Sequence, residues 1–372
     1  MASLQQVAER AGVSTTTASR VLSRAPGVER ISPETRQVVF EAAQALGYEA
    51  STIARALRTG RNHAVGFLAP DVPSPFLSAI LVGAEGVFQK NGYHILISIT
   101  EQDPQEEESW LASFTQRIDG ALVTGGSYRA NAEHVLARFR RRGVAVALIG
   151  IEWAGSGVPS VLVDNGSAAR EAVEYLASLG HRRIGYVGCE SIAVDNSGVH
   201  RLAGYKAGLE HAGLPYDPAQ VVMAPHPVEG CGYAQARELL NRSPNVTAVL
   251  AFNDYLAMGV IRAARELGRR VPQELSVIGF DDMPWAPYLC PALTSVRQPL
   301  ERVGRIAAEK LLEQIRDSRG APESVGSGTE AREENTMALK AELVVRESTA
   351  SPGCVQQVVE RSAGLTASER RK

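Results

Sequence analysis

Apolar segments of strand length recur between residues 64 and 282, and stretches with helical periodicity separate them. Strands that alternate with helices predict parallel, doubly wound sheets, because each helix returns the chain to the same edge of the sheet. There are too many such segments for one sheet, so we expect two α/β lobes with a cleft between them. The segments are 64-AVGFLAP-70, 94-HILISIT-100, 120-GALVTGG-126, 144-VAVALIGI-151, 161-VLVDN-165, 183-RIGYVG-188, 246-VTAVLAFND-254 and 275-LSVIGFDD-282.

Several of these segments end in small or polar residues. In open α/β sheets, ligands bind beyond the carboxyl ends of the strands. The candidate pocket residues are therefore Pro70-Asp71, Gly125-Gly126, Asp164-Asn165, Asn253-Asp254 and Asp281-Asp282.

The first sixty residues have a different pattern, that of short helices with capping residues. Ser3 and Gln6 form a capping-box pattern, and Gly12 ends the first helix. Ser14 can cap a second helix that runs to about Leu22, with Ala18, Val21 and Leu22 inward. A third helix opens at 32-SPET-35, closes at Gly47 and is expected to bury Val38, Val39, Ala42, Ala43 and Leu46. Two helices joined by a tight glycine turn and followed by a third predict a helix-turn-helix.

Charge and cysteine content narrow the class of protein. Residues 1–62 carry a net charge of +3, although the whole chain carries −2, which suggests a polyanion partner at one end. The four cysteines are far apart and form no C-x-x-C pair, which argues for a reducing compartment and against a zinc site or disulfide framework. No apolar run approaches the length of a membrane span, and no secretion signal is visible, so we expect a cytoplasmic protein without a membrane partner.

The sequence resembles the lactose/galactose repressor (LacI/GalR-type) family of bacterial helix-turn-helix transcription regulators. The resemblance covers about residues 2–350. Its motifs are 7-VAERAGVSTTTASRVL-22, 33-PETRQVV-39, 47-GYEASTIARALRTGR-61, 163-VDN-165, 179-LGHRRIGYVG-188, 201-RLAGY-205, 252-FND-254, 278-IGFDD-282, 293-LTSVRQP-299 and 343-LVVREST-349.

The resemblance implies an all-α helix-turn-helix headpiece joined to an α/β two-lobed core like that of periplasmic binding proteins, with two doubly wound parallel sheets. The headpiece would span residues 1–50, a hinge helix 51–62 and the core 63–350. Because the chain crosses between the lobes three times, the N-lobe would comprise about 63–161 and 292–318, and the C-lobe about 162–291 and 337–350. Residues 316–336 are expected to form a mobile loop, and 351–372 a partly disordered tail.

The second helix of the headpiece would enter the major groove of DNA. By the resemblance, Thr15, Thr16 and Arg20 occupy the base-reading positions, where hydroxyls can donate or accept and an arginine can bind a guanine through two hydrogen bonds. Thr17 and Ser19 are expected to face phosphates or the first helix. The alternative is a helical hairpin packed for stability alone.

The segment 51-STIARALRTG-60 matches the family's hinge. There Leu57 would insert into the minor groove at the centre of the operator and kink the duplex, with Arg55 and Arg58 near phosphates or groove walls. The alternative is an ordinary amphipathic linker with Leu57 in a core. This chain departs from the family in having Ala50 where a proline is usual, and the connection 24–35 is about three residues longer than usual.

In the core, the resemblance places Arg201 and Asp281 on the ligand, with Asn253 at another pocket position and Phe76 as an aromatic wall. Asp195 and Ser197 would also point inward, and Asp195 stands where purine-responsive members carry a basic residue. An acid there favours sugar hydroxyls or an amine over an anion. Arg201 and Asp281 could instead form a structural ion pair across the lobes, and Trp153 and Trp285 line the cleft or belong to the core.

These features predict a DNA-binding regulator, most often a repressor, that binds a pseudo-palindromic double-stranded operator as a homodimer and is switched by a small-molecule effector. No cofactor or metal is indicated. A solute-binding module without DNA function would lack the headpiece, and an enzyme would need a nucleophile–base or metal constellation that we do not find. The run 138-RFRRRG-143 is interpreted as a solvated helix end.

Overall fold

The computed structural model describes residues 2–22, 28–48, 61–69, 75–99, 111, 113–124, 132–153, 155–190, 196–225, 229–317 and 335–352. The chain divides into two compact units, which are treated separately below. One comprises residues 1–63 with 117–119, and the other comprises residues 64–116 and 120–372.

The described part of the first unit contains the three expected helices and one short 3-10 turn. The capping box of Ser3 and Gln6 is present, Gly12 ends the first helix in the left-handed conformation, and Ser14 accepts a hydrogen bond from the Thr17 backbone N–H. Ala18, Val21 and Val39 lie in the small core between the helices. The elements are α1 (Leu4–Ala11), α2 (Thr15–Leu22), η1 (Val28–Arg30) and α3 (Pro33–Ala45).

One expectation about α3 is wrong. Val38 was expected on the buried face, but it is 45% exposed, as is the neighbouring Phe40 at 41%. Val39, Ala42 and Ala43 form the buried face of α3 instead. Residues three and four positions apart lie on the same face of a helix, whereas Val38 is rotated about 100° away from Val39.

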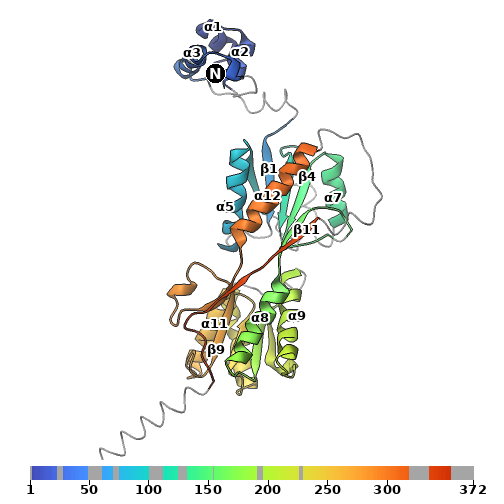
Figure 1. Ribbon diagram of the computed structural model, residues 1–372, viewed down its shortest axis with the longest axis vertical. Coiled ribbons are helices and arrows are strands. Elements are labelled where there is room, and N and C mark those ends of the chain that lie inside the picture. The colour runs from blue at the N-terminus through green and yellow to red at the C-terminus, as the bar shows by residue number, and fades with distance from the viewer. Residues whose placement is uncertain are drawn as a thin grey trace, which may run out of the picture. The chain divides into compact units, whose positions relative to one another are not determined.

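The second unit contains two six-stranded sheets with helices around them (Figure 1). The N-lobe sheet has the order β11-β5-β4-β3-β1-β2, and the C-lobe sheet has the order β12-β10-β9-β8-β6-β7. The strands are β1 (Ala64–Ala69), β2 (His94–Ile99), β3 (Gly120–Thr124), β4 (Ala145–Ile149), β5 (Ser160–Val163), β6 (Ile184–Cys189), β7 (Val221–Ala224), β8 (Ala248–Ala251), β9 (Ser276–Asp281), β10 (Thr294–Arg297), β11 (Thr336–Leu339) and β12 (Glu342–Val344).

Helices connect these strands. In the N-lobe, α5 and α12 pack side by side over one face of the sheet, and their contact is close because Gly83 and Gly304 each approach the backbone of the other helix. The helices are α5 (Pro75–Lys90), α7 (Ala132–Arg141), α8 (Asn165–Ser178), α9 (Asn196–His211), α10 (Tyr233–Arg242), α11 (Asp254–Glu266) and α12 (Leu300–Asp317), with 3-10 turns η3 (Pro218–Gln220), η4 (Glu229–Gly232) and η5 (Ala286–Tyr288).

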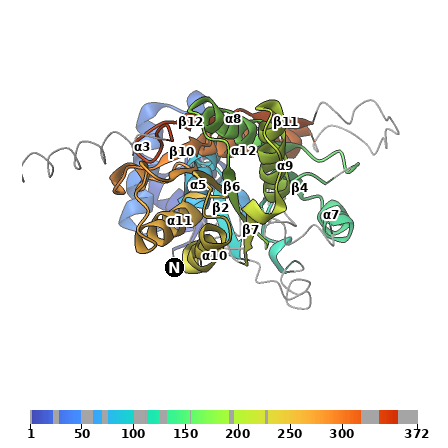
Figure 2. The same cartoon turned by 90° about the horizontal axis from the view of Figure 1, so that it is seen from below.

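In the C-lobe, helices cover both faces of the sheet. Helices α8 and α9 lie on one side and α10 and α11 on the other (Figure 2). Successive residues of β8 alternate between the two cores, with Ala248 and Leu250 in one and Val249 and Ala251 in the other. A strand buried on both faces has no polar side, which explains the continuous apolar runs of the sequence.

The strand assignments differ from the expectation at four short strands. Strands β7, β10, β11 and β12 are not among the expected strands. Strand β12 pairs antiparallel with β10, so the C-lobe sheet is mixed rather than fully parallel. Asp317 still belongs to α12 and Thr336 already belongs to β11, which leaves 318–334 of the expected loop outside the described residues.

The expected lobe boundaries also shift. Strand β10 was placed in the N-lobe but pairs with β9 of the C-lobe, and β11 was placed in the C-lobe but pairs with β5 of the N-lobe. The chain therefore leaves the C-lobe sheet after Arg297, not near residue 292, and returns to it only after Leu339. The tail beyond residue 352 lies outside the described residues. No helix in the described part of the chain is both long enough and apolar enough to cross a membrane.

Candidate functional site

The turn that follows β9 carries the most unusual backbone of the core. Asp281 has a φ of 100° and Asp282 a φ of 52°, so two successive non-glycine residues adopt positive φ. Such residues are uncommon, and they occur more often at ligand sites than elsewhere. The turn lies at the carboxyl end of a parallel strand, where α/β sheets bind ligands.

Arg201 of α9 contacts this turn through the side chain of Asp281. Its side chain is almost fully buried, 4% of the residue being exposed, and its guanidinium lies between the rings of Phe252 and Phe280, 4.5 and 3.7 Å from their centroids. Its Nη2 lies 3.3 Å from the Asp281 carboxylate, with which it forms an ion pair. The ion pair of the alternative is therefore present, but both partners belong to the C-lobe, so its placement across the lobes is wrong.

Arg201 makes further hydrogen bonds, and the Asp281 Oδ1 atom that it contacts accepts a second one. Arg201 Nε donates to Asn165 Oδ1 at 2.8 Å, and its Nη1 donates to the Phe252 carbonyl. Gln298 donates from its side-chain amide to the Asp281 carboxylate at 2.6 Å. Burial raises the pKa of Asp281, although the nearby Arg201 and the hydrogen bond from Gln298 oppose that shift.

Behind Asp281 lies a second, fully buried carboxyl, that of Asp254 at the start of α11. It accepts hydrogen bonds from the Met283 backbone N–H at 2.7 Å and from the Ser295 hydroxyl at 2.5 Å. Burial, together with the negative charge of Asp281, raises the pKa of Asp254 to about 7. The Asp282 carboxylate forms ion pairs with Arg297 and Arg346.

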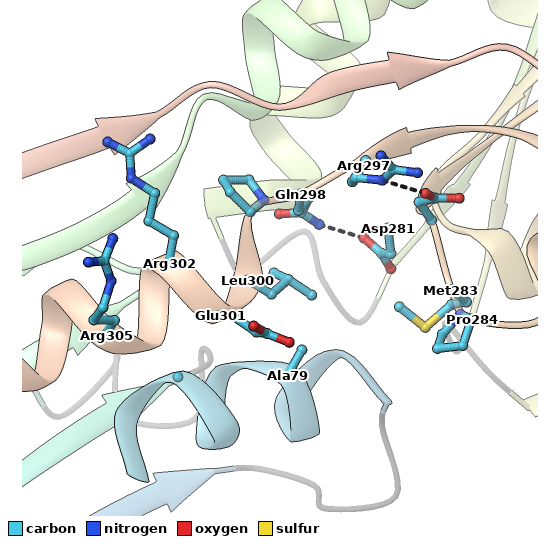
Figure 3. Close-up of a pocket in the computed structure, with 13 residues that line it drawn as sticks. Ala79, Asp281, Met283, Pro284, Arg297, Gln298, Leu300, Glu301, Arg302 and Arg305 are labelled. Carbon is cyan, nitrogen blue, oxygen red and sulfur yellow. Dashed lines mark hydrogen bonds and ion pairs between the residues drawn. The ribbon is translucent and has the colours of Figure 1, made fainter. Parts of the chain in front are cut away.

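An open pocket of about 590 Å³ lies in front of this turn. Figure 3 shows Asp281, Met283 and Pro284 on its C-lobe side, with Gln298 reaching Asp281, and Ala79 and Leu300 on its N-lobe side. The described lining residues include three carboxylates and three guanidinium groups, so their formal charges cancel. The lining is Ala79, Gly83, Asp281, Asp282, Met283, Pro284, Arg297, Gln298, Pro299, Leu300, Glu301, Arg302 and Arg305.

The expected pocket residues differ in where they lie, and some lie outside the described part of the chain. Asp281 lines the pocket, and Arg201 lies behind it. Asn253 is buried and caps α11 by accepting a hydrogen bond from the Leu256 N–H, and Ser197 is half-buried near the start of α9. Phe76 falls within α5, but its side chain, like the whole of Asp195, lies outside the described residues.

Several contacts of this constellation were not assigned from the sequence. Gln298 and the two phenylalanines that enclose Arg201 belong to the recognised motifs 293-LTSVRQP-299, 252-FND-254 and 278-IGFDD-282. Their place in these motifs was the signal that the sequence offered. Trp153 is buried and Trp285 is half-buried against Tyr255, and neither belongs to the described lining of the pocket.

In the headpiece, the residues expected to read DNA lie on α2. Thr15, Thr16 and Arg20 are exposed, whereas Thr17 and Ser19 are half-buried, and the Thr17 hydroxyl lies 2.9 Å from that of Ser14. Ala18 and Val21, on the opposite face, are buried in the helical core. The hinge residues Arg55, Leu57 and Arg58 lie outside the described residues.

Comparison with known proteins identifies the class. The family model described as bacterial regulatory proteins, lacI family, matches residues 3–51, and the one described as a periplasmic binding protein-like domain matches residues 173–349. The HTH-type transcriptional repressor PurR of Photorhabdus laumondii is 32% identical over 323 residues, which cover 86% of this chain and 92% of the relative. The PurR repressor of Klebsiella pneumoniae is 31% identical over 329 residues, covering 87% and 94%.

Solved structures show the same architecture. A complex of the transcriptional regulator CelR with cellobiose is 29% identical, with a TM-score of 0.67, over 94% of this chain and 100% of that one. A lacI-family regulator from Enterococcus faecium with bound ribose is 26% identical, with a TM-score of 0.66, over 77% and 99%. The Lac repressor dimer bound to operator, 24% identical with a TM-score of 0.78 over 94% and 99%, shares the fold.

The chain belongs to the lacI family of bacterial regulatory proteins. It is a DNA-binding transcription regulator whose core binds a small-molecule effector. The pocket in front of Asp281 is the candidate site for this effector and is named the effector pocket.

Proposed function

We propose that this protein is a repressor that binds a pseudo-palindromic operator as a homodimer and that an uncharged, polyhydroxylated compound in the effector pocket controls its affinity for DNA. The PurR relatives are named as repressors, and the Lac repressor structure is that of a dimer on its operator. A two-fold symmetric dimer matches a two-fold symmetric site, since each headpiece then reads one half-site.

At the DNA end, α2 supplies the base-reading side chains. Thr15, Thr16 and Arg20 project from the exposed face of a helix whose opposite face is packed, which is the arrangement that a recognition helix requires. Thr17 and Ser19 would contact phosphates, and the hinge residues Arg55, Leu57 and Arg58 would bend the duplex at its centre.

At the effector end, the observation that carries the proposal is the charge balance of the lining around Asp281. A carboxylate held by Arg201 and Gln298 can accept hydrogen bonds from two hydroxyls, and the equal numbers of acidic and basic groups among the described lining residues do not favour a charged ligand. Arg201, Asn253 and Ser197, with Phe76 and Asp195, would complete the site. The sugar complexes of CelR and of the Enterococcus regulator are consistent with this class of ligand.

A calorimetric and thermal-shift panel tests the effector class. We expect an uncharged sugar such as cellobiose or D-ribose to raise the melting temperature of the full chain, because a ligand that binds only the folded state stabilises it. Hypoxanthine and ribose 5-phosphate, as a purine and an anionic sugar, should not. Asp281→Asn, which keeps the shape of the side chain, should abolish the shift while DNA binding persists. Binding of only the anionic or purine compounds would overturn the proposed class.

As a regulator of this family, the protein would act in the cytoplasm at the nucleoid and would not be an enzyme. The relatives in the comparisons are transcriptional regulators. Incubation of the bound sugar with the protein, followed by chromatography, should recover the sugar unchanged. A stoichiometric excess of product would refute this part of the proposal.

A further inference from the structure

The conformation of the turn Asp281–Met283 requires support from its surroundings. Two successive non-glycine residues with positive φ are unfavourable on their own, and such backbone persists only where neighbouring groups over-determine it. The contacts of the Asp281 side chain itself, with Arg201 and Gln298, fix its carboxylate but do not reach the backbone of the next two residues.

Asp254 and Ser295 bind the backbone of this turn. One oxygen of the Asp254 carboxylate accepts the Met283 N–H at 2.7 Å, and the other accepts the Ser295 hydroxyl at 2.5 Å. The Ser295 oxygen in turn accepts the Asp282 N–H at 3.1 Å. Both backbone donors that follow Asp281 are therefore bound, one directly and one through Ser295, by a single carboxylate.

Space for this carboxylate is provided by a glycine in β9. A Cβ on Gly279 would lie 2.1 Å from Asp254 Oδ1, a distance that no side chain could occupy. Asp254 and Ser295 are both fully buried, and neither belongs to the described lining of the effector pocket. A buried carboxyl is costly to keep, and here its two oxygens are used on the turn rather than on a ligand.

We propose that Asp254 and Ser295 are positioning residues of the effector pocket: they hold the turn Asp281–Met283, whose first two residues have positive φ, in the conformation that presents Asp281 to the ligand. This inference rests on the proposed function, because it assigns Asp281 to ligand binding. The side-chain ion pairs of Asp282 with Arg297 and Arg346 fix the turn on its other side.

The chain offers a matched control for Ser295. Ser348 is equally buried in the same lobe, and its hydroxyl also donates one hydrogen bond, to the Val277 carbonyl, and accepts one, from the Thr294 N–H. Ser295→Ala and Ser348→Ala therefore remove the same number of buried hydrogen bonds. Only Ser295→Ala removes support from the turn.

The first test needs no ligand. The melting temperature is measured for Asp281→Asn in the wild-type, Ser295→Ala and Ser348→Ala backgrounds of the full chain. If Ser295 positions Asp281, the shift caused by Asp281→Asn should fall to about half or less in the Ser295→Ala background and stay unchanged in the Ser348→Ala background, since only interacting sites are non-additive. Equal shifts in all three backgrounds would overturn the proposal.

The second test uses the uncharged sugar, cellobiose or D-ribose, that binds the wild-type protein. Ser295→Ala and Asp254→Asn should raise the Kd of this sugar about tenfold, as expected for the loss of a buried hydrogen-bond partner. Ser348→Ala should change the Kd by less than about twofold. An unchanged Kd in Ser295→Ala would contradict the positioning role. If neither sugar binds the wild-type protein, the proposed effector class fails, and the melting-temperature comparison still decides whether Ser295 acts on Asp281.

Discussion

Helix α2 and the turn after β9 use polar side chains in opposite ways. On α2, Thr15, Thr16 and Arg20 are exposed, and the hydrogen bonds that Ser14 makes around them join residues three positions apart. At the turn, Asp254 and Ser295 are fully buried, and each of their contacts joins segments far apart in the sequence.

The difference shows how each site can vary. Residues that read DNA from an exposed helix face carry little of the stability of the fold, so their identity can change with the operator. Residues around Asp281 hold the lobe together and, in the proposed function, also bind the ligand, so a change there is expected to alter both properties. Four measurements test this contrast, and they are given in order of decreasing expected change in the free energy of unfolding.

Arg201→Ala should give the largest loss, about 3–5 kcal/mol, because it leaves the Asp281 carboxylate buried without its cation. Urea unfolding of the core measures it. The control is Arg262→Ala, whose exposed ion pair with Glu266 should contribute less than about 1 kcal/mol. If Arg201→Ala lowered the free energy of unfolding as little as Arg262→Ala does, the buried ion pair would contribute no more to stability than the exposed one.

The pKa of Asp254 predicts a pH-dependent difference between the wild type and Asp254→Asn. A folded-state pKa of about 7, above the ordinary value of 3.8, means that the folded protein retains a proton that the unfolded chain releases. The wild type should therefore lose stability relative to Asp254→Asn as the pH rises from about 4 to about 7, by an amount on the order of 4 kcal/mol, because the folded and unfolded pKa values differ by about three units. The facing carboxylates of Asp281 and Asp282 add to the effect, and the hydrogen bonds from Ser295 and Met283 oppose it.

Urea unfolding of both proteins at several pH values measures this difference. A constant difference between pH 4 and 8 would indicate that Asp254 keeps the same charge in the folded and unfolded states throughout that range. The stability contributed by the turn would then be independent of pH over this range.

Ser14→Ala should have a smaller effect, about 1 kcal/mol, because it removes the side-chain acceptor for the Thr17 N–H at the start of α2. Hydrogen exchange of the α2 amides should speed up about fivefold. Ser14→Asp keeps an acceptor at this position and should exchange at close to the wild-type rate. Equal acceleration in both variants would assign the effect to something other than the cap.

Arg20→Ala, Thr15→Ala and Thr16→Ala should have the smallest effect on stability, within about 0.5 kcal/mol. Arg20→Ala should nevertheless lose about 1–3 kcal/mol of discrimination between operators, because the proposed bidentate contact of Arg20 with a base would be lost. Selection of operators from a random duplex library measures discrimination, and binding of the sugar should remain intact. A loss of stability in Arg20→Ala close to that in Arg201→Ala would remove the contrast.

The sequence by itself determined the elements whose signals are local. The capping residues Ser3, Ser14 and Ser32 begin helices as expected. The eight apolar runs form β1 to β6, β8 and β9. These signals depend on neighbours within a few residues, so they can be read from the chain directly. The strands that were missed are three or four residues long.

Only the tertiary structure decided where the chain crosses between the lobes and which polar groups meet. The motifs pointed to Arg201 and Asp281, but Gln298, Phe280 and the support from Asp254 and Ser295 emerge only when β9, β10 and α11 pack together. The burial of Val39 rather than Val38 was likewise set by packing within the headpiece. The physical reason is the same in each case: a polarity pattern shows which face of an element is apolar, but the partner of a buried polar group is fixed by segments that are distant in the sequence.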